Sequence, residues 1–394
     1  MQAKDCVKEN ANNVRRVPSG CPIRSGVGRL AVAAPGLLAA LGIAWLGGQL
    51  AQGLGRALFV LRGVDPAGRA SPISAISMAV LLGILLANTV RLPALLQPGL
   101  DLARKRVLRL GIVLIGLKLS VLDVIRVGAV GLPVVIVLVT FAFAISLWLA
   151  RRLAVSRELG SLAAASTAIC GITATLAVAP VVRADDREVA YTVANVTLIG
   201  LLGMLVYPYV AHALFGDSSL AAGLFLGTSI HDTSQVMGAA LTYAGVRGDE
   251  RALQIATITK LTRNALLVAV IPALAVLASR ATGTRGGERR PLRSYFPTFV
   301  LAFVALSLLR TFGDLGLEHH ERAFGLFTEP AFRKGIQLLA DRVAPLALGM
   351  ALAAVGVGTR LSILRGLGWR PLAVGFGAAV AVGCASAILS ALIA

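Results

Sequence analysis

Long apolar runs alternate with short polar connections along almost the whole chain. Crossing the hydrocarbon core of a bilayer takes roughly 20 mostly apolar residues in a helix, and eleven runs come close to this length or exceed it. They cover residues 30–54, 72–90, 106–127, 129–150, 160–183, 188–212, 218–245, 252–279, 294–312, 336–358 and 371–393. The pattern predicts an all-α polytopic membrane protein of about 10–11 transmembrane helices.

The composition points the same way. Of 394 residues, 57% are apolar and 14% are charged, whereas a soluble domain carries about 25% charged residues. Mean hydropathy is +0.81. The alternative is a very apolar soluble helical protein, which would need helices with polar faces; most of these runs have none. We therefore expect a tail at 1–29, a transmembrane transporter domain at 30–394, and a lipid bilayer as the surrounding partner.

The meaning of the net charge of +19 depends on where the basic residues lie along the chain. On a soluble protein it would suggest nucleic acid, but here the arginines lie mainly between apolar runs, which favours the positive-inside rule and no nucleic-acid partner. The clusters at 151–157, 280–293 and 360–370 are expected in the cytoplasm together with the N-terminus. The acidic connections at 185–188, 249–250 and 314–321 are then expected outside. The four cysteines are far apart, so no metal, cofactor or disulfide framework is expected.

One internal repeat is visible. Residues 115–122 read IGLKLSVL and residues 357–364 read VGTRLSIL, so that Lys118 corresponds to Arg360. Each stretch ends one predicted span, and the two spans point in opposite directions. This predicts an inverted repeat, which is common in secondary transporters. The alternative is chance similarity between apolar sequences.

Three of the runs contain polar segments: AASTAICGITATLAVAP (164–180), LGTSIHDTSQVMGA (226–239) and TITKLTRNALL (257–267). Glycines weaken a helix, so the first two segments predict broken helices. The N-terminus of a half-helix attracts anions. The alternative for the hydroxyl residues is close helix packing. The candidate binding residues in these two segments are Ser166, Thr167, Cys170, Gly171, Thr173, Ser229, His231, Asp232, Thr233 and Gln235.

The third segment places Lys260, Arg263 and Asn264 on one helical face. A Lys or Arg at the centre of a span costs roughly 2.5–3.5 kcal/mol on insertion scales, so a compensating anionic substrate is one explanation. The alternatives are snorkelling to the interface or an ion pair with Asp232. His231 titrates near neutral pH unless it is perturbed, and Asp232 is a candidate carrier of a coupling proton. The alternative for His231 is a buried histidine with its hydrogen bonds satisfied.

The segments ICG followed by small residues and AP, GTSIHDTSQV, and KLTRN, in this order, resemble the YeiH-type family of bacterial inner-membrane proteins, for which sulfate export is proposed. The resemblance covers roughly residues 30–394. It implies the fold of cation/proton antiporters and bile-acid symporters, with two inverted repeats and crossed broken helices. The residues that match family motif positions are Cys170, Gly171, His231, Asp232, Thr233, Gln235, Lys260 and Arg263. Ile172 departs from the family pattern, where a small residue is usual.

The leading interpretation is a secondary transporter, and specifically an exporter, of a small anion such as sulfate or a related sulfur oxyanion. A coupling proton or sodium ion and a homodimer are compatible with it. No G-x-x-x-x-G-K-[ST] motif is present, which argues against ATP drive within this chain. One alternative is an anion channel. A weaker alternative is an intramembrane enzyme with Cys170 or Ser229 as nucleophile and His231 as base; the chain is not expected to be an enzyme.

Overall fold

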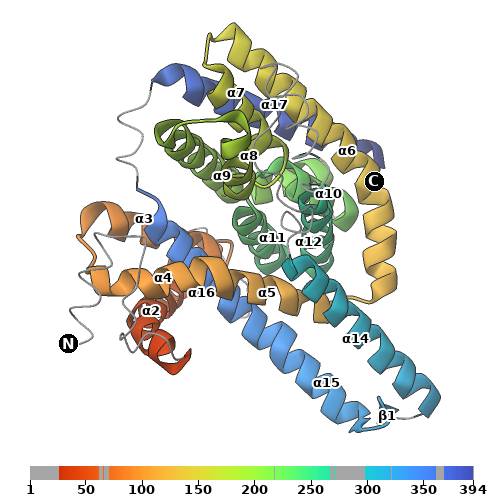
Figure 1. Ribbon diagram of the computed structural model, residues 1–394. Helices are drawn as coiled ribbons and strands as arrows, with labels where there is room; N and C mark the ends of the chain where they lie inside the picture. Colours follow the sequence, from red (N-terminus) through yellow and green to blue (C-terminus); the bar gives the residue numbers. More distant parts are fainter. Residues whose placement is uncertain are drawn as a thin grey trace.

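The computed structural model describes residues 26–61, 65, 71–216, 218–266, 270, 298–320, 322–360 and 368–393. Nearly all of these residues are helical, and the chain path is shown in Figure 1. Six helices in the described ranges are long and apolar enough to cross a membrane. The all-α, polytopic architecture predicted from the sequence is therefore confirmed.

The longer helices have the following bounds. They are α2 (Gly26–Leu61), α3 (Ala75–Thr89), α6 (Val121–Arg152), α9 (Asp186–Phe215), α12 (Glu250–Ala265), α14 (Thr298–His320), α16 (Ala344–Gly358) and α17 (Trp369–Ile393). Four elements, α4 (Gln97–Leu102), the π-helical η3 (Ala103–Val107), α5 (Leu108–Ile115) and η4 (Gly116–Lys118), follow one another without interruption up to Lys118. In the same way α15 (Glu329–Gln337) and the π-helical η6 (Leu338–Val343) continue into α16. A 3₁₀ turn, η2 (Ala94–Leu96), precedes α4, and the short strands β1 (Arg322–Ala323) and β2 (Phe327–Thr328) pair between α14 and α15.

The predicted span at 160–183 is a re-entrant hairpin. It consists of α7 (Arg157–Ala168) and α8 (Ile172–Val182), which pack against each other. The hydroxyl of Ser156, just before α7, donates to Glu188 Oε1 at 2.6 Å, and Glu188 lies just after α8. A straight arrangement of α7 and α8 would separate these residues by roughly 35 Å at 1.5 Å per residue. The segment therefore enters and leaves at the same end of the bundle, which we call the Arg152 end because α6 also ends there.

The predicted span at 218–245 is a second hairpin, built from α10 (Ser219–Ser229) and α11 (Thr233–Arg247). Ser219 Oγ donates to Asp249 Oδ1 at 3.0 Å, which closes its base. Asp249 is followed by Glu250, which pairs with Lys118 at 3.0 Å. This hairpin therefore enters at the opposite, or Lys118, end. Helix α9, of 30 residues, connects the two bases across the bundle.

These hairpins change two predictions. The acidic stretch 185–188 lies at the same end as Arg157, so the prediction that these two connections lie on opposite sides of the membrane is wrong. The sequence could not reveal this, because a hairpin of two short apolar helices has the length and composition of a single span. The crossed broken helices implied by the family resemblance are likewise replaced by two hairpins that enter from opposite ends. The predicted breaks themselves are present, at residues 169–171 and 230–232.

The helices that end in the two repeat stretches run antiparallel, as an inverted repeat requires. Lys118 pairs with Asp341 at 3.0 Å at one end of the contact between them. Gly358 lies against the Arg104 guanidinium at the other end. Residues 361–367 of the second repeat, the basic 280–293 connection and residues 1–25 of the predicted tail lie outside the described ranges.

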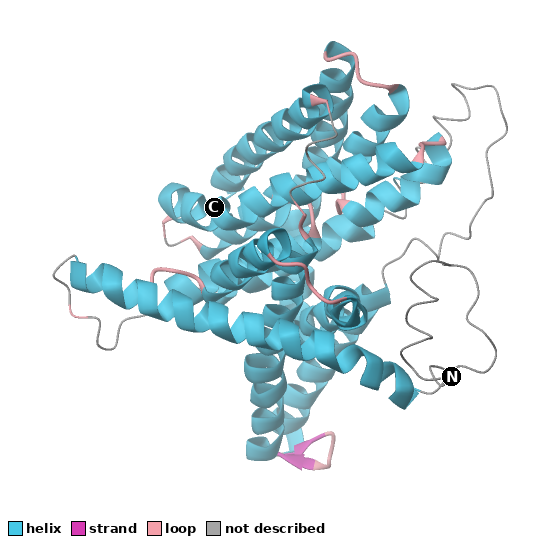
Figure 2. Ribbon diagram, turned by 90° about the vertical axis from the view of Figure 1, so that its left-hand side faces the viewer, coloured by secondary structure: helices cyan, strands magenta, loops and turns pink. Residues whose placement is uncertain are grey.

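The helices form two groups that pack mainly within themselves. The hairpin group contains α6 to α12 and α17, and occupies the upper part of Figure 1; the scaffold group contains α2 to α5 and α14 to α16, and occupies the lower part. Figure 2 shows the arm of α14 and α15, with the strands at its tip, projecting from the scaffold group. Few pairs of helices make contact across the boundary, among them α11 with α3 and with α16.

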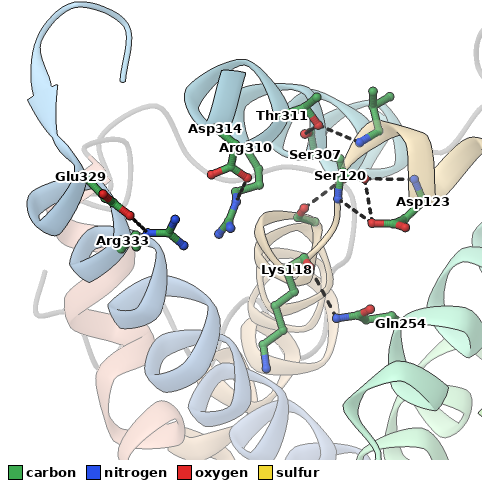
Figure 3. A network of polar contacts seen from close by, with 12 residues as sticks. Lys118, Ser120, Asp123, Gln254, Ser307, Arg310, Thr311, Asp314, Glu329 and Arg333 are labelled. Carbon is green, nitrogen blue, oxygen red and sulfur yellow. Dashed lines mark hydrogen bonds and ion pairs between the residues drawn. The ribbon is translucent and has the colours of Figure 1, made fainter. Parts of the chain in front are cut away.

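Polar contacts at the Lys118 end join the two groups (Figure 3). The turn between η4 and α6 is capped by Ser120, whose hydroxyl accepts from the Asp123 backbone N–H at 3.1 Å. Ser307 of α14 donates to Gly116 O at 3.0 Å, and Gln254 of α12 donates to Lys118 O at 3.5 Å. Lys118 itself lies between Glu250 of the hairpin group and Asp341 of the scaffold group.

The hairpin geometry predicts which positions share one side of the membrane. Single cysteines at Arg157 and Arg187 should react with an impermeant maleimide from the same side, in a background with the native cysteines replaced by serine. A cysteine at Arg247, at the base of the second hairpin, should react from the other side. The measurement is labelling of right-side-out and inverted membrane vesicles. Labelling of 157 and 187 from opposite sides would show that α7 and α8 together cross the membrane.

Candidate functional site

The two hairpin tips meet in the interior of the hairpin group. Helix α7 has 12 residues and α10 has 11, which puts the tips about 18 Å and about 16 Å from their respective ends at 1.5 Å per residue. The two depths together match the roughly 30 Å thickness of a bilayer core. Helix α12 passes both tips and places Lys260 and Arg263 beside them, only 0% and 1% exposed.

The Lys260 ammonium donates to three backbone carbonyl oxygens from both tips. Nζ lies 3.1 Å from Ile169 O in the first hairpin and 3.1 Å from Ile230 O in the second, and it also donates to His231 O. An ammonium has three N–H donors, so all three are engaged. Neither snorkelling nor an ion pair with Asp232 describes this residue, since no such pair occurs among the described residues.

The Arg263 guanidinium binds the same two tips one helical turn further along α12. Nε donates to Ala168 O at 2.7 Å and Nη2 donates to Thr167 O, both at the end of α7. Nη1 donates to Thr228 O at 2.6 Å, at the end of α10, and makes a longer 3.5 Å contact with Ile230 O. Lys260 and Arg263 thus bind three carbonyls from each hairpin.

These carbonyls would otherwise be unpaired at the C-terminal ends of α7 and α10. The last carbonyls of a helix have no partner within the helix, and they form the negative end of its dipole. In an apolar interior an unsatisfied backbone group costs several kcal/mol. The two cations therefore satisfy both hairpin tips and compensate their charge.

The second halves of the hairpins begin next to each other. Gly171 precedes α8 with φ +62° and ψ −113°, a conformation that side chains disfavour. A β-carbon at Gly171 would lie 3.5 Å from the β-carbon of Asp232. Asp232 caps α11 by accepting from the backbone N–H of Ser234 at 2.8 Å and from the Ser234 hydroxyl. The N-termini of α8 and α11 thus lie close together near the centre of the bundle.

A narrow cleft leads from the Arg152 end to the hairpin tips. It begins at Val155 and Leu159 and runs between α7, α9 and α17 to Ser166, Thr167 and His231. Its polar lining also includes Tyr191, Thr192 and Asn195 of α9. These α9 residues are not among the predicted site residues, although the polar side chains at 191, 192 and 195 were a visible signal in this run.

Several buried polar atoms at this site have no hydrogen-bonding partner among the residues that the structure describes. Both ring nitrogens of His231 are unpartnered, although the residue is only 2% exposed. Three carboxamide oxygens are likewise without a partner among the described residues. Each of these amides donates an N–H to another residue, and that hydrogen bond assigns which end of the amide is the oxygen. The three oxygens are Asn195 Oδ1, Gln235 Oε1 and Asn264 Oδ1, with the donor sides bonded to Pro371 O, Thr197 O and Thr233 Oγ1. Buried groups of this kind are expected to find partners, which favours a polar occupant.

The structure brings nearly all predicted binding residues to the tips. Buried there are Ser166, Thr167, Cys170, Gly171, Ser229, His231, Gln235, Lys260, Arg263 and Asn264, with Asp232 and Thr233 half-buried. Thr173 is exposed, one turn into α8. The groups required by the enzyme alternative do not interact: Ser229 Oγ and both His231 nitrogens lack partners, and Cys170 is a free, buried thiol.

The fold and the site define a helical, multi-pass membrane protein whose paired re-entrant hairpins are held together by buried cations. The chain belongs to the family described as conserved hypothetical protein 698, whose sequence model matches residues 35–375.

Relatives in other bacteria carry the name UPF0324 membrane protein. The Nitratidesulfovibrio vulgaris protein is 30% identical over 77% of this chain and 79% of its own length. The Bordetella bronchiseptica protein is 32% identical over 77% of this chain and 88% of its own. The Pseudomonas putida protein is 32% identical over 77% of this chain and 80% of its own length. No solved structure matches the chain significantly.

The bonding of Arg263 predicts a large stability effect. Arg263→Gln should lower stability by about 2 kcal/mol or more, because at least two buried carbonyls lose their partner and each costs roughly 1–3 kcal/mol. Arg251→Gln, at an exposed position on the same helix, should stay within about 0.5 kcal/mol of wild type. The measurement is thermal unfolding of the purified proteins in one detergent. Equal Tm values for the two variants would mean that the carbonyl contacts contribute little.

Proposed function

We propose that this protein is a secondary transporter, and specifically an exporter, of a small anion such as sulfate or a related sulfur oxyanion. The observation that carries the proposal is the meeting of two opposed hairpins beside two buried cations. In secondary transporters, the N-termini of broken helices near the membrane centre face anionic substrates, while carbonyls at helix C-terminal ends face cations. Both kinds of helix end come together here.

The charge balance at the tips favours an anion. Lys260 and Arg263 carry two positive charges, whereas Asp232, which caps α11, is the one carboxylate that the described residues place at the hairpin tips. The N–H groups in the first turns of α8 and α11 add positive potential, and that of Ser234 is bonded to Asp232. The proposed ligands are these N–H groups together with Thr233, Asn264 and His231; Lys260 and Arg263 act through their charge and through holding the tips in place.

The two helix groups suit alternating access, in which one body moves against another around a central site. The cleft reaches the tips from the Arg152 end, where Arg151, Arg157 and Arg370 also lie. The positive-inside rule assigns this end to the cytoplasm. In this orientation, proposed for the bacterial inner membrane with the N-terminus inside, the cleft faces the cytoplasm. Its volume of about 10 Å³ holds about one water molecule, so export requires the cleft to widen.

The channel and enzyme alternatives have less support. Broken helices and inverted repeats are typical of secondary transporters, which favours a carrier over a channel. A nucleophile needs a base within hydrogen-bonding reach, and neither candidate nucleophile contacts His231. The proposal includes no cofactor.

Counterflow in proteoliposomes tests the proposal. Liposomes with the purified protein, preloaded with unlabelled sulfate or sulfite, should take up the labelled anion faster than unloaded ones, and uptake should saturate. Protein-free liposomes are the control. Uptake that rises linearly with concentration and ignores preloading would indicate a channel, and the absence of flux for a panel of sulfur oxyanions and other small anions would contradict a transporter of this class.

Asp232 is predicted to act in coupling. Asp232→Asn should change the pH dependence of uptake more than the KM for the anion, because asparagine caps a helix about as well as aspartate but cannot carry the negative charge. Asp185→Asn is the matched control, since Asp185 caps α9 in the same way but lies at the surface. The measurement is initial uptake rate from pH 5.5 to 8.5. Identical pH profiles for wild type and both variants would remove Asp232 from coupling.

A further inference from the structure

Three backbone carbonyl oxygens converge on one point at the hairpin tips. Ile169 O comes from the first hairpin, and Ile230 O and His231 O come from the second. All three belong to unwound residues between half-helices rather than to regular helix. The Lys260 ammonium occupies the point of convergence, and we call the three oxygens with this point the carbonyl cage.

An oxygen set of this kind is suited to a monovalent cation. Rings of backbone carbonyls replace the hydration shell of an ion in selectivity filters. In broken-helix transporters, unwound carbonyls and helix C-terminal ends coordinate Na⁺. The C-terminal ends of α7 and α10 point at the cage and add the negative ends of their dipoles. A cation is therefore required here on electrostatic grounds, whatever its source.

In this chain the cation at the carbonyl cage is the side chain of Lys260. Lys260 is fully buried, its three N–H donors match the three oxygens in number, and no described carboxylate lies within 4 Å of its nitrogen. Its charge is thus balanced by carbonyl dipoles, as the charge of a bound inorganic cation would be. Arg263 binds the adjacent carbonyls, so the carbonyls of both tips are bonded without an external cation.

We propose that the Lys260 ammonium is a built-in substitute for a coupling cation, so that the carbonyl cage is a monovalent-cation site which this protein fills with its own side chain. The inference rests on the proposed transport function only where it concerns flux. It has two consequences. The wild-type protein binds its anion without Na⁺, and removal of the ammonium with its side-chain volume opens the cage to Na⁺.

Two substitutions distinguish the effect of removing the positive charge from the effect of removing side-chain volume. Lys260→Ala removes the ammonium and leaves room for an ion, whereas Lys260→Met removes the charge but keeps an unbranched side chain in the cage. Tm is measured for wild type and both variants in detergent, in NaCl and in N-methyl-D-glucamine chloride of equal ionic strength. Lys260→Ala should gain about 3 °C or more in NaCl, as a ligand bound only to the folded state stabilises it. Wild type and Lys260→Met should not respond. An equal shift in all three proteins, a shift in wild type, or no shift in a folded Lys260→Ala protein would overturn the proposal.

A flux measurement decides the matter if Lys260→Ala does not fold. Wild-type uptake in proteoliposomes should be unchanged, within a factor of about two, when N-methyl-D-glucamine replaces Na⁺ on both sides. A requirement for Na⁺ would overturn the substitution by Lys260. The absence of any anion flux would count against the proposed function alone, because the thermal measurements on the cage do not depend on transport.

Discussion

The structure depends on the hydrogen bonds that Lys260 and Arg263 make to two hairpin tips inside an apolar bundle. Each tip leaves the last carbonyls of a short helix without a helical partner, in a place that water and lipid cannot satisfy. Lys260 and Arg263 provide charged N–H groups for six of these carbonyls, three from each hairpin. Without this bonding the tips would be strongly unfavourable, so one turn of α12 makes both hairpins possible.

The same bonding determines which groups remain available at the centre. The cations are occupied by the C-terminal ends of α7 and α10, and the N-terminal ends of α8 and α11, the latter capped by Asp232, begin beside them. Gly171 and Asp232 bring these two ends together. His231, whose backbone carbonyl belongs to the carbonyl cage, also lines the cleft, and its imidazole has no hydrogen-bonding partner in the described part of the chain. The proposed binding groups and the groups that hold the tips together thus lie on the same few residues.

A side-chain hydrogen bond also closes the base of each hairpin. Ser156 with Glu188 closes the first base, and Ser219 with Asp249 closes the second. Between the helix groups, Lys118 lies between Glu250 and Asp341, with partners on both sides of the boundary. A hairpin group that is internally braced, and joined to its scaffold by few contacts, has the properties expected of a body that moves as a unit.

The sequence by itself determined the membrane class, the positions of the helix breaks and almost all residues at the tips, because apolar length, glycine and buried charge are local signals. Residues 169–171 and 230–232 break where the polar segments predicted, and Lys260 and Arg263 are buried there. Only the tertiary structure decided that the broken segments turn back, and hence that residues 185–188 lie at the Arg152 end. It alone revealed Asn195 in the cleft and the carbonyls that bind Lys260. Backbone carbonyls carry no sequence signal, and a hairpin and a span of equal length bury similar apolar surface, so contacts between distant residues made the difference.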